Sequence, residues 1–471
     1  NEKFFDEKFF DLFNFRHFEE KKVRRGIGFD KPELDPNDPN TCGCVSDKSF
    51  GHYGFTGSVA WVDPETEIIY VFLSNRTFPD ENNNSLSDYN IRTEIQKLVH
   101  EAFDWMNIII VCYPTYGGSG VLATELGHKL AEFGHKIHFV AYKKPVRLKL
   151  IDNKVLFHKV NVPFYPLFNF QPYELALSSK IVEISENNKI DLIHVHYAIP
   201  HAYAAYMAKE MLKTKNIDLP IVTTLHGTDI TLVGKHPFYR RAVKFSIQNS
   251  DVVTSVSENL KKDTMDFFNI DKEIKVIPNF IDIDRFKQKN ENCNQDDKII
   301  ISHVSNFRPV KNIRILMSII AKFKSKNLFF NLIGEGPELD LAKSFVEKNK
   351  INNIKFHGNT EKIEEILCST DIFLLPSKKE SFGLAALEAM ASKCSLVTSN
   401  CGGLPELNIE NQTGYLVDVN NENKYVEKIK YLISDKSKLE KFKLSSFQRA
   451  KLFDIDIVVP IYENIYKRLI K

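Results

Sequence analysis

The sequence is poor in the features that mark disulfide-rich, membrane-spanning or nucleic-acid-binding proteins. Its 471 residues contain seven cysteines, and the net charge is only +2. An odd number of scattered cysteines argues against a closed disulfide framework and favours reduced thiols. No apolar run is long enough to span a bilayer, and the N-terminus lacks a signal-peptide pattern. We therefore expect a cytoplasmic protein with no stable membrane insertion and no nucleic-acid partner.

The chain changes character near residue 105. Before it, the apolar runs Ser58–Val62 and Glu67–Leu73 flank a turn that contains Pro64, which predicts a β-hairpin. Residues 91–103 place apolar side chains at helical spacing. At Met106 a continuous apolar run begins, which is typical of a strand buried on both faces. We expect an N-terminal α+β fragment over residues 1–105, fused to a sequence that could have begun at Met106.

From Met106 onward, strands and helices alternate in two series. Pro278 and an Asn-rich stretch over residues 287–297 separate the series. This pattern predicts the α/β class, with two doubly wound, Rossmann-like lobes and a cleft between them. Ligands of such sheets bind outside the carboxyl ends of the strands. The expected strands lie at 106–112, 136–140, 190–195, 220–225, 251–256, 275–279, 298–304, 328–333, 354–357, 372–375 and 395–398.

A glycine-rich loop, Gly117–Gly120, follows the strand at 106–112 and precedes a helix. Glycines let the backbone approach a ligand, and the helix N-terminus favours an anion. The alternative is a tight strand–helix turn without a ligand. The loop matches neither the P-loop nor the full dinucleotide fingerprint.

Two glutamates flank a second loop–helix junction. Glu380 follows the strand at 372–375 and a break at Pro376, and Glu388 lies on the next predicted helix. Backbone amides near Phe382 and Gly383 can bind a phosphate, while both carboxylates can accept hydrogen bonds from sugar hydroxyls. Taken alone, the pair could also be a surface glutamate and a helix-face glutamate.

Cationic and histidine-rich loops follow other strands. Arg308 and Lys311 share one loop, which suits a diphosphate, although solvated charge is the alternative. His194–His201 and His226–Asp229 follow two strands of the first lobe, so both should open on the cleft. Their histidines could be core residues, metal ligands or substrate contacts, and the spacing is not that of a zinc helix motif.

Residues 106–471 resemble the family 4 retaining glycosyltransferases of the GT-B fold. Two glutamates separated by seven residues are that family's signature, and Asn400–Glu406 and Ile277–Asp282 also resemble it. The resemblance implies an acceptor lobe over residues 106–285, a UDP-sugar donor lobe over residues 286–453 and a helix over residues 454–471 that recrosses to the first lobe. It also implies that no cofactor or catalytic metal is needed.

The resemblance also implies residue roles. Arg308 and Lys311 would hold the diphosphate, and Asn306 stands where many members have an arginine. Glu380 would bind the sugar, Glu388 the ribose, and His226 the sugar near the reacting carbon. The catalytic residues are then expected to be His226, Arg308, Lys311 and Glu380. The donor contacts are expected to be Gly117, Gly118, Ser119, Asn306, Arg308, Lys311, Glu380, Ser381, Phe382, Gly383, Leu384 and Glu388.

The segments Cys112–Val121, His196–His201, Leu225–Gly234 and Ser305–Arg308 are similar to those of family members that transfer N-acetylglucosamine from UDP to the hydroxyl of L-malate in bacillithiol biosynthesis. This implies a UDP-N-acetylglucosamine donor and a small dicarboxylate acceptor, which needs local positive charge. Another acceptor, such as inositol phosphate or a lipid-linked sugar, and a non-catalytic sugar-nucleotide-binding protein are the alternatives, and a homo-oligomer stays open. The expected acceptor contacts are His196, Tyr197, Thr228, Arg240 and Arg241.

In the N-terminal fragment, Gly51–Gly57, Trp61–Pro64 and Phe72–Arg76 resemble the C-terminal part of serine β-lactamase-like hydrolases. In that family the segment around Thr56-Gly57 is a strand lining the active site. The Ser-x-x-Lys nucleophile motif belongs upstream of this segment and is not present, so we expect this part to be catalytically inactive by itself. A small accessory domain is the alternative.

Overall fold

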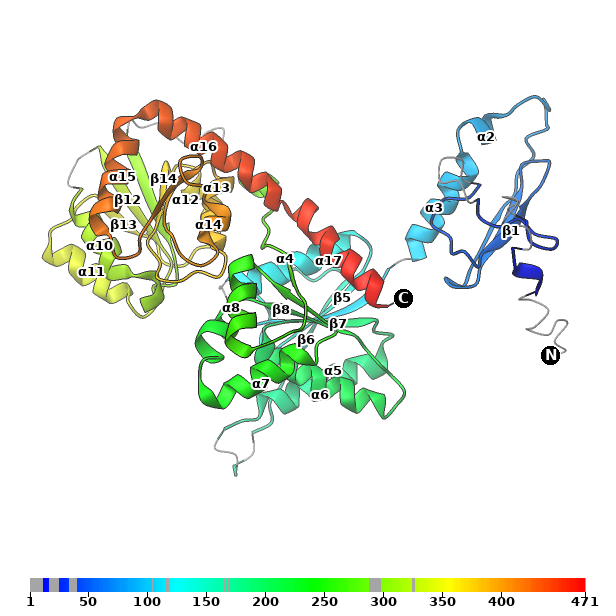
Figure 1. Cartoon of the computed structure of the whole chain (residues 1–471), viewed down its shortest axis with the longest axis horizontal. Coiled ribbons are helices and arrows are strands. Elements are labelled where there is room, and N and C mark those ends of the chain that lie inside the picture. The colour runs from blue at the N-terminus through cyan, green and yellow to red at the C-terminus, as the bar shows by residue number, and fades with distance from the viewer. Residues whose placement is uncertain are drawn as a thin grey trace. The chain divides into compact units, whose positions relative to one another are not determined.

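The computed structural model describes residues 12–16, 25–33, 40–103, 105–115, 118–164, 166–167, 170–287, 298–323 and 327–470. The chain forms two compact units, Asn1–Trp105 and Met106–Lys471 (Figure 1). The division between them coincides with the change of sequence character near residue 105.

The first unit is built around an antiparallel sheet of three strands, β1 (Phe50–Tyr53), β2 (Val59–Asp63) and β3 (Ile68–Phe72). Trp61 on β2 is buried and lies opposite Gly51 and Tyr70. A side chain at Gly51 would overlap the Trp61 ring, because an added Cβ would lie 2.3 Å from it. The sheet packs its buried face against Ile95 and Val99 of α3 (Ile91–Phe103), which follows the short helix α2 (Ser85–Asp88).

Two segments of this unit that the sequence singled out belong to the three-stranded sheet and its turns. The hairpin around Pro64 is confirmed as the pairing of β2 with β3. Thr56 and Gly57 lie in the turn between β1 and β2, so the segment around them includes parts of both strands. The amide of Gly54 donates to the carbonyl of Ser58, and Gly57 has a φ of +89°, which a glycine adopts without strain.

The expectation of reduced thiols is wrong for Cys42 and Cys44, which form a disulfide. The amide of Cys42 donates to Oε1 of Gln96 on α3, so the bridged turn is held against that helix. The expectation is also wrong for Cys368 of the second unit, which is disulfide-bonded, whereas Cys112, Cys394 and Cys401 are free thiols.

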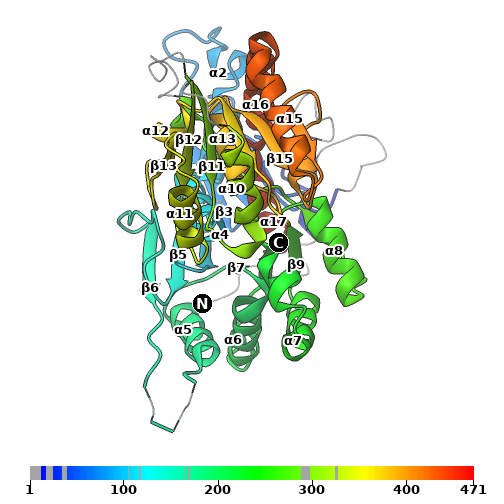
Figure 2. The same ribbon diagram turned by 90° about the vertical axis from the view of Figure 1, so that its left-hand side faces the viewer.

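The first lobe of the second unit is a parallel sheet of seven strands in the order β10-β9-β8-β7-β4-β5-β6. Strand β4 is buried on both faces, which explains its continuous apolar sequence. Ile108 and Ile110 pack in one core with residues of α4, whereas Ile109 and Val111 pack in another with residues of α5 and α6. Helices α5 and α6 lie together along one side of this lobe (Figure 2). The strands are β4 (Asn107–Val111), β5 (Lys136–Ala141), β6 (Val155–Lys159), β7 (Leu192–His196), β8 (Ile221–Leu225), β9 (Val252–Ser255) and β10 (Ile274–Val276). The helices are α4 (Gly118–Glu132), α5 (Tyr173–Asn187), α6 (Tyr203–Lys213), α7 (Pro237–Gln248) and α8 (Glu258–Phe268), with short helical turns η2 (Ala198–Ala202) and η3 (Asp229–Val233).

The second lobe is a parallel sheet of six strands in the order β13-β12-β11-β14-β15-β16. In both lobes the order reverses beside the first strand, which is the doubly wound arrangement. The expected fold class is therefore confirmed. The strands are β11 (Ile299–Val304), β12 (Leu328–Ile333), β13 (Ile354–Phe356), β14 (Ile372–Leu375), β15 (Ser395–Ser399) and β16 (Gly414–Val417). The helices are α9 (Ile283–Lys287), η4 (Pro309–Lys311), α10 (Ile313–Ala321), α11 (Leu339–Lys348), α12 (Ile363–Leu367), α13 (Leu384–Ala391), α14 (Leu404–Leu407), α15 (Glu422–Ser434), α16 (Lys436–Ala450) and η5 (Lys451–Phe453).

The last helix, α17 (Ile455–Leu469), returns to the first lobe. Its side chains Tyr462 and Tyr466 are buried in the same core as Ile108 and Ile110. The two segments that connect the lobes run side by side. Ile281 donates its amide to Phe453 and accepts a hydrogen bond from the amide of Ile455. Within the described residues, no helix combines the length and apolar character that a membrane crossing requires.

Candidate functional site

A cavity of about 510 Å³ is lined by both lobes of the second unit. The first lobe contributes the start of α4 and the loops after β7 and β8, and the second contributes the loops after β11 and β14 and the start of α13. All these segments follow the carboxyl ends of parallel strands, where such sheets bind ligands. The expected site residues that line the cavity are Gly118, Ser119, Tyr197, His226, Thr228, Asn306, Arg308, Lys311, Glu380, Ser381, Phe382, Gly383, Leu384 and Glu388.

The glycine-rich loop brings the first turn of α4 to the cavity. An added Cβ on Gly120 would lie 2.5 Å from the carbonyl oxygen of Tyr113, so the turn requires glycine there. Gly118 lies against Leu384 of the second lobe, at a distance of 3.0 Å for an added Cβ. The first amides of a helix have no partner within the helix, so this turn can receive an anion. The expected donor contact Gly117 lies outside the described residues.

Glu380 is held by two donors on one side of its carboxylate. Nζ of Lys311 lies 2.5 Å from Oε1 of Glu380, and the hydroxyl of Ser377 donates to the same oxygen at 2.8 Å. The backbone around Glu380 is packed against Gly402 and Gly403, and the amide of Gly403 donates to the Glu380 carbonyl. Both side-chain donors therefore share one oxygen of the carboxylate, and Glu380 lines the cavity.

Glu388 lies one helical turn into α13 and lines the cavity. Burial raises the pKa of its carboxyl to about 7, although the charge of Arg147 acts in the opposite direction. Gly383, which precedes α13, has a φ of +101°, so the chain enters the helix through a left-handed residue. A carboxyl in this position can accept hydrogen bonds from hydroxyl groups once it is ionised.

A column of histidines lies behind the first-lobe wall. The rings of His194 and His196 stack at 4.6 Å between centroids, and those of His196 and His226 at 5.1 Å. Nδ1 of His196 lies 2.8 Å from Nε2 of His226. Burial lowers the pKa of His194 and of His226 to about 3, so these rings are neutral at neutral pH.

The loops that carry this column are tied together by a buried aspartate. Asp229 accepts hydrogen bonds from the amides of Ala198 and Gly227, each at 2.9 Å. Burial raises the pKa of Asp229 to about 6, and these amides act against that rise. In front of the column, the hydroxyls of Ser119 and Tyr197 are 2.7 Å apart, which joins α4 to the loop after β7.

Three of the expected acceptor contacts do not line the cavity. His196 is buried behind His226. Arg240 and Arg241 are exposed on α7, and Arg240 donates to the carbonyl of Phe267 and lies over its ring. Arg240 and Arg241 therefore lie outside this cavity, because α7 presents them to solvent.

Sequence reasoning missed one cavity cation, Arg147. It follows β5 in a loop, has a φ of +64°, and pairs with Glu125 of α4 at 2.9 Å. Arg285 of α9 approaches the same carboxylate at 3.6 Å and pairs with Glu364 of α12 at 2.9 Å. The only sequence signal for Arg147 was its place after a predicted strand.

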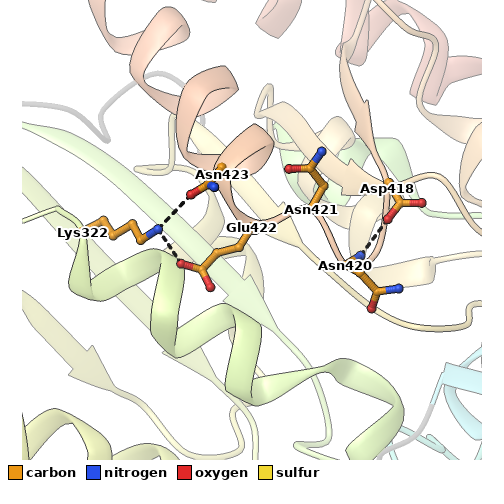
Figure 3. A pocket seen from close by; sticks show the side chains of 6 residues that line it. All are labelled: Lys322, Asp418, Asn420, Asn421, Glu422 and Asn423. Atoms are coloured by element: carbon orange, nitrogen blue, oxygen red, sulfur yellow. Dashed lines mark hydrogen bonds and ion pairs between the residues drawn. The ribbon is translucent and has the colours of Figure 1, made fainter.

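Two further features lie outside this cavity. Lys322, Asp418 and residues 420–423 line a polar surface depression, in which Lys322 pairs with Glu422 at 2.7 Å and bonds Asn423 at 3.0 Å (Figure 3). These contacts tie α10 to the start of α15. In the first unit, Cys42, Cys44 and His100 form the one group of three potential metal ligands that the described parts of the chain contain. Since the two sulfurs are joined as a disulfide, they are not thiolate ligands in this structure.

Comparisons with known proteins agree with this architecture. Residues 284–449 match the family described as glycosyl transferases group 1, and residues 116–285 match glycosyltransferase family 4. The chain is 38% identical over 374 residues to N-acetyl-alpha-D-glucosaminyl L-malate synthase of Bacillus anthracis, which covers 77% of this chain and 96% of that protein. The chain belongs to the family 4 glycosyltransferases.

More distant relatives share the fold of this family 4 glycosyltransferase. An uncharacterized glycosyltransferase of Methanocaldococcus jannaschii is 27% identical over 361 residues, which covers 76% of this chain and 97% of that protein. A glycosyltransferase structure from Rickettsia africae has a TM-score of 0.65 at 22% identity, and covers 78% of this chain and 99% of that one. The structure of Anabaena HepE with UDP and glucose has a TM-score of 0.64 at 18% identity, and covers 76% of this chain and 99% of that one. Residues 1–105 lie outside both family matches, and their likeness to β-lactamase-like hydrolases stays a prediction.

Proposed function

We propose that this glycosyltransferase transfers N-acetylglucosamine from UDP-N-acetylglucosamine to the hydroxyl of L-malate, with retention at the anomeric carbon. The observation that carries the proposal is the composition of one cavity. Its second-lobe wall holds Lys311, Glu380 and Glu388, and its first-lobe wall holds Ser119, Tyr197 and Thr228. The similarity to the Bacillus anthracis malate synthase supports the choice of both substrates.

The donor would bind along the second lobe. Glu388 accepts hydrogen bonds from the ribose hydroxyls, and Oε2 of Glu380 accepts one from the sugar, since Lys311 and Ser377 occupy Oε1. Lys311 and the first amides of α4 and α13 stabilise the negative charge that develops on the departing diphosphate. Gly383 enters α13 with a φ of +101°, and a Cβ added there would lie 2.6 Å from Leu404, so this turn requires glycine.

The acceptor would bind between the donor sugar and the first lobe. Burial raises the pKa of Tyr197 to about 12, and the positive charge of Arg308 acts against that rise, so Arg308 lies within electrostatic reach of this tyrosine. Arg308 therefore takes the place that we expected for Arg240 or Arg241, as a cation for an acceptor carboxylate. The same cation can serve the diphosphate, because attacking and leaving oxygens share one face in a retaining transfer.

In the reaction, the bond between the malate oxygen and the anomeric carbon forms as the bond from that carbon to the phosphate oxygen breaks. The malate hydroxyl gives its proton to the departing phosphate oxygen, and the products are UDP and the malate glycoside. The protein then needs to supply positioning and charge stabilisation rather than a strong base. No cofactor enters this proposed scheme.

The test is UDP release from UDP-N-acetylglucosamine by the purified full chain with L-malate, with glycerate and inositol phosphate as control acceptors. Malate-dependent release would support the proposal. Release only with another acceptor would refute malate and retain the enzyme class. If no acceptor gave release, even after removal of residues 1–105, a non-catalytic sugar-nucleotide-binding protein would be favoured.

A further inference from the structure

The histidine column connects the cavity to the returning helix α17. His226 lines the cavity, His196 lies behind it, and His194 lies behind His196. The hydroxyl of Tyr466 on α17 is 2.7 Å from Nδ1 of His194, and Nε2 of His194 is 2.8 Å from the hydroxyl of Thr224. Both ring nitrogens of His194 are thus engaged, and its contact with His196 is ring stacking alone.

The hydrogen bonds of His196 determine where its proton lies. Nδ1 of His196 is 2.8 Å from Nε2 of His226, while Nε2 of His196 is buried and has no hydrogen-bond partner among the described residues. A buried N–H without an acceptor is more costly than a bare ring nitrogen without a donor. His196 therefore carries its proton on Nδ1 and donates it to Nε2 of His226.

The tautomer of His226 follows from this bond. Because Nε2 of His226 accepts a hydrogen bond, the neutral ring carries its proton on Nδ1. Burial lowers the pKa of His226 to about 3 and holds that of His196 well below its usual range, so neither ring gains a second proton at neutral pH. His226 can then offer an N–H donor toward the cavity, not a bare nitrogen.

The backbone around the column fixes its geometry. The carbonyl of His196 accepts a hydrogen bond from Nδ1 of His201 at 2.5 Å. Asp229 joins the loop after His196 to the loop after His226 through the amides of Ala198 and Gly227. The two rings are therefore held from their main chains as well as by their mutual hydrogen bond.

We propose that His196 is a positioning residue, which fixes His226 in the tautomer that donates a hydrogen bond from Nδ1 to an oxygen of the bound donor sugar. The proposal rests on the proposed transfer reaction, in which His226 lies beside the reacting carbon. It assigns His196 a role behind the catalytic wall instead of the direct acceptor contact expected from the sequence. Residues that orient a ligating or catalytic group in this way typically contribute about 10- to 100-fold to activity.

Two variants at one position separate the hydrogen bond from the packing. His196→Phe keeps a stacked ring and removes the donor, whereas His196→Asn supplies an amide N–H near the position of Nδ1. We expect His196→Phe to lower kcat about 10- to 100-fold with little change in the KM for UDP-N-acetylglucosamine. His196→Asn should recover most of kcat. A merely structural role would predict the opposite order, because phenylalanine preserves the stack better than asparagine.

His138→Phe is the matched control. His138 is also buried in the first lobe, and its Nδ1 lies 3.0 Å from Nε2 of His158, with the rings stacked at 5.1 Å. It does not line the cavity, so its replacement should leave kcat unchanged. Equal kcat values for the wild type and His196→Phe would overturn the proposal, as would an equal loss in His138→Phe.

Nitrogen NMR of the histidine-labelled full chain gives a readout that does not depend on turnover. Signals of His226 are assigned by their loss in His226→Asn. We expect a protonated Nδ1 and a bare Nε2 on His226 of the wild type, and loss of this single form in His196→Phe. A protonated Nε2 on wild-type His226 would overturn the proposal, even if His196→Phe did not fold. Failure of the proposed function would look different, because the wild type would then release no UDP while its tautomer stayed as expected.

Discussion

Replacing Glu388 with glutamine should stabilise the protein at alkaline pH and weaken its binding of the nucleotide. The reason is the burial of this carboxyl, which raises its pKa from 4.5 to about 7. A folded-state pKa above the unfolded value means that the folded protein binds the proton more tightly. The stability that this proton contributes is fully present below pH 4.5 and is lost as the pH rises to about 7.

The size of the stability change follows from the same shift in the pKa of Glu388. A rise from 4.5 to about 7 corresponds to ~3 kcal/mol, at ~1.4 kcal/mol for each tenfold change in proton affinity. Because Glu388 lines an open cavity, solvent screens part of this cost, and we expect Glu388→Gln to gain ~1 kcal/mol at pH 8. A gain of this size raises the Tm by roughly 2–4 °C. Near pH 5, where the folded wild type is already protonated, the difference should shrink.

Nucleotide binding should change in the opposite direction. A hydrogen bond to a charged acceptor is worth ~1.5–3 kcal/mol, so loss of the carboxylate should weaken UDP binding about 10-fold or more. Thermal unfolding at pH 5 and pH 8 and titration calorimetry with UDP measure the two effects. The control is Glu427→Gln, since Glu427 is exposed on α15 and pairs only with Lys424 among the described residues. A Glu388→Gln variant that is less stable than the wild type at pH 8, or that binds UDP equally well, would refute the reasoning.

Three other variants test the roles of Lys311, Tyr197 and Arg240. Lys311→Met should lower kcat/KM about 10²- to 10³-fold with unchanged circular dichroism, because the diphosphate loses its cation, and near-normal turnover would contradict that role. Tyr197→Phe should raise the KM for the acceptor several-fold and leave the KM for the donor unchanged, since Tyr197 lies on the first-lobe wall where we propose that the acceptor binds; steady-state kinetics with each substrate varied distinguishes the two. Arg240→Ala should leave both KM values within about twofold of the wild type, and a specific loss of acceptor affinity would restore the sequence-based assignment.

The fold could be predicted from the sequence where strands are buried on both faces. Ile108–Val111 is such a segment, and its unbroken apolar run marks the first strand of the first lobe. Strand β6 escaped notice because it is the edge strand and is only partly buried after Val155, so it carries His158 and Lys159.

The cavity could be predicted where its residues follow strands closely. Lys311, Glu380 and Glu388 were found from their spacing and their place in the chain. Arg147 could not be found in this way, because what brings it to the cavity is a backbone with positive φ and an ion pair with Glu125, which is distant in sequence. Arg240 was assigned because a dicarboxylate acceptor needs local positive charge, and a charged segment carries no clear sequence signal of which helix face is turned to solvent.

The environment of His196 also could not be predicted from the sequence. Residues two apart on a strand point to the same side, so His194 and His196 were bound to share an environment. The sequence does not tell whether that side is cavity or core. The answer depends on α17, whose Tyr466 closes the far end of the column.

The return of α17 to the first lobe affects the order in which the protein can be completed on the ribosome. Tyr462 and Tyr466 belong to the core that contains Ile108 and Ile110, yet they are synthesised after the entire second lobe. During translation part of the apolar surface of the first lobe therefore stays exposed until α17 is made, although the second lobe already contains all its strands. A chain truncated before α17 would leave this apolar surface of the first lobe exposed. Chaperones and proteases would therefore recognise the truncated product through its first lobe.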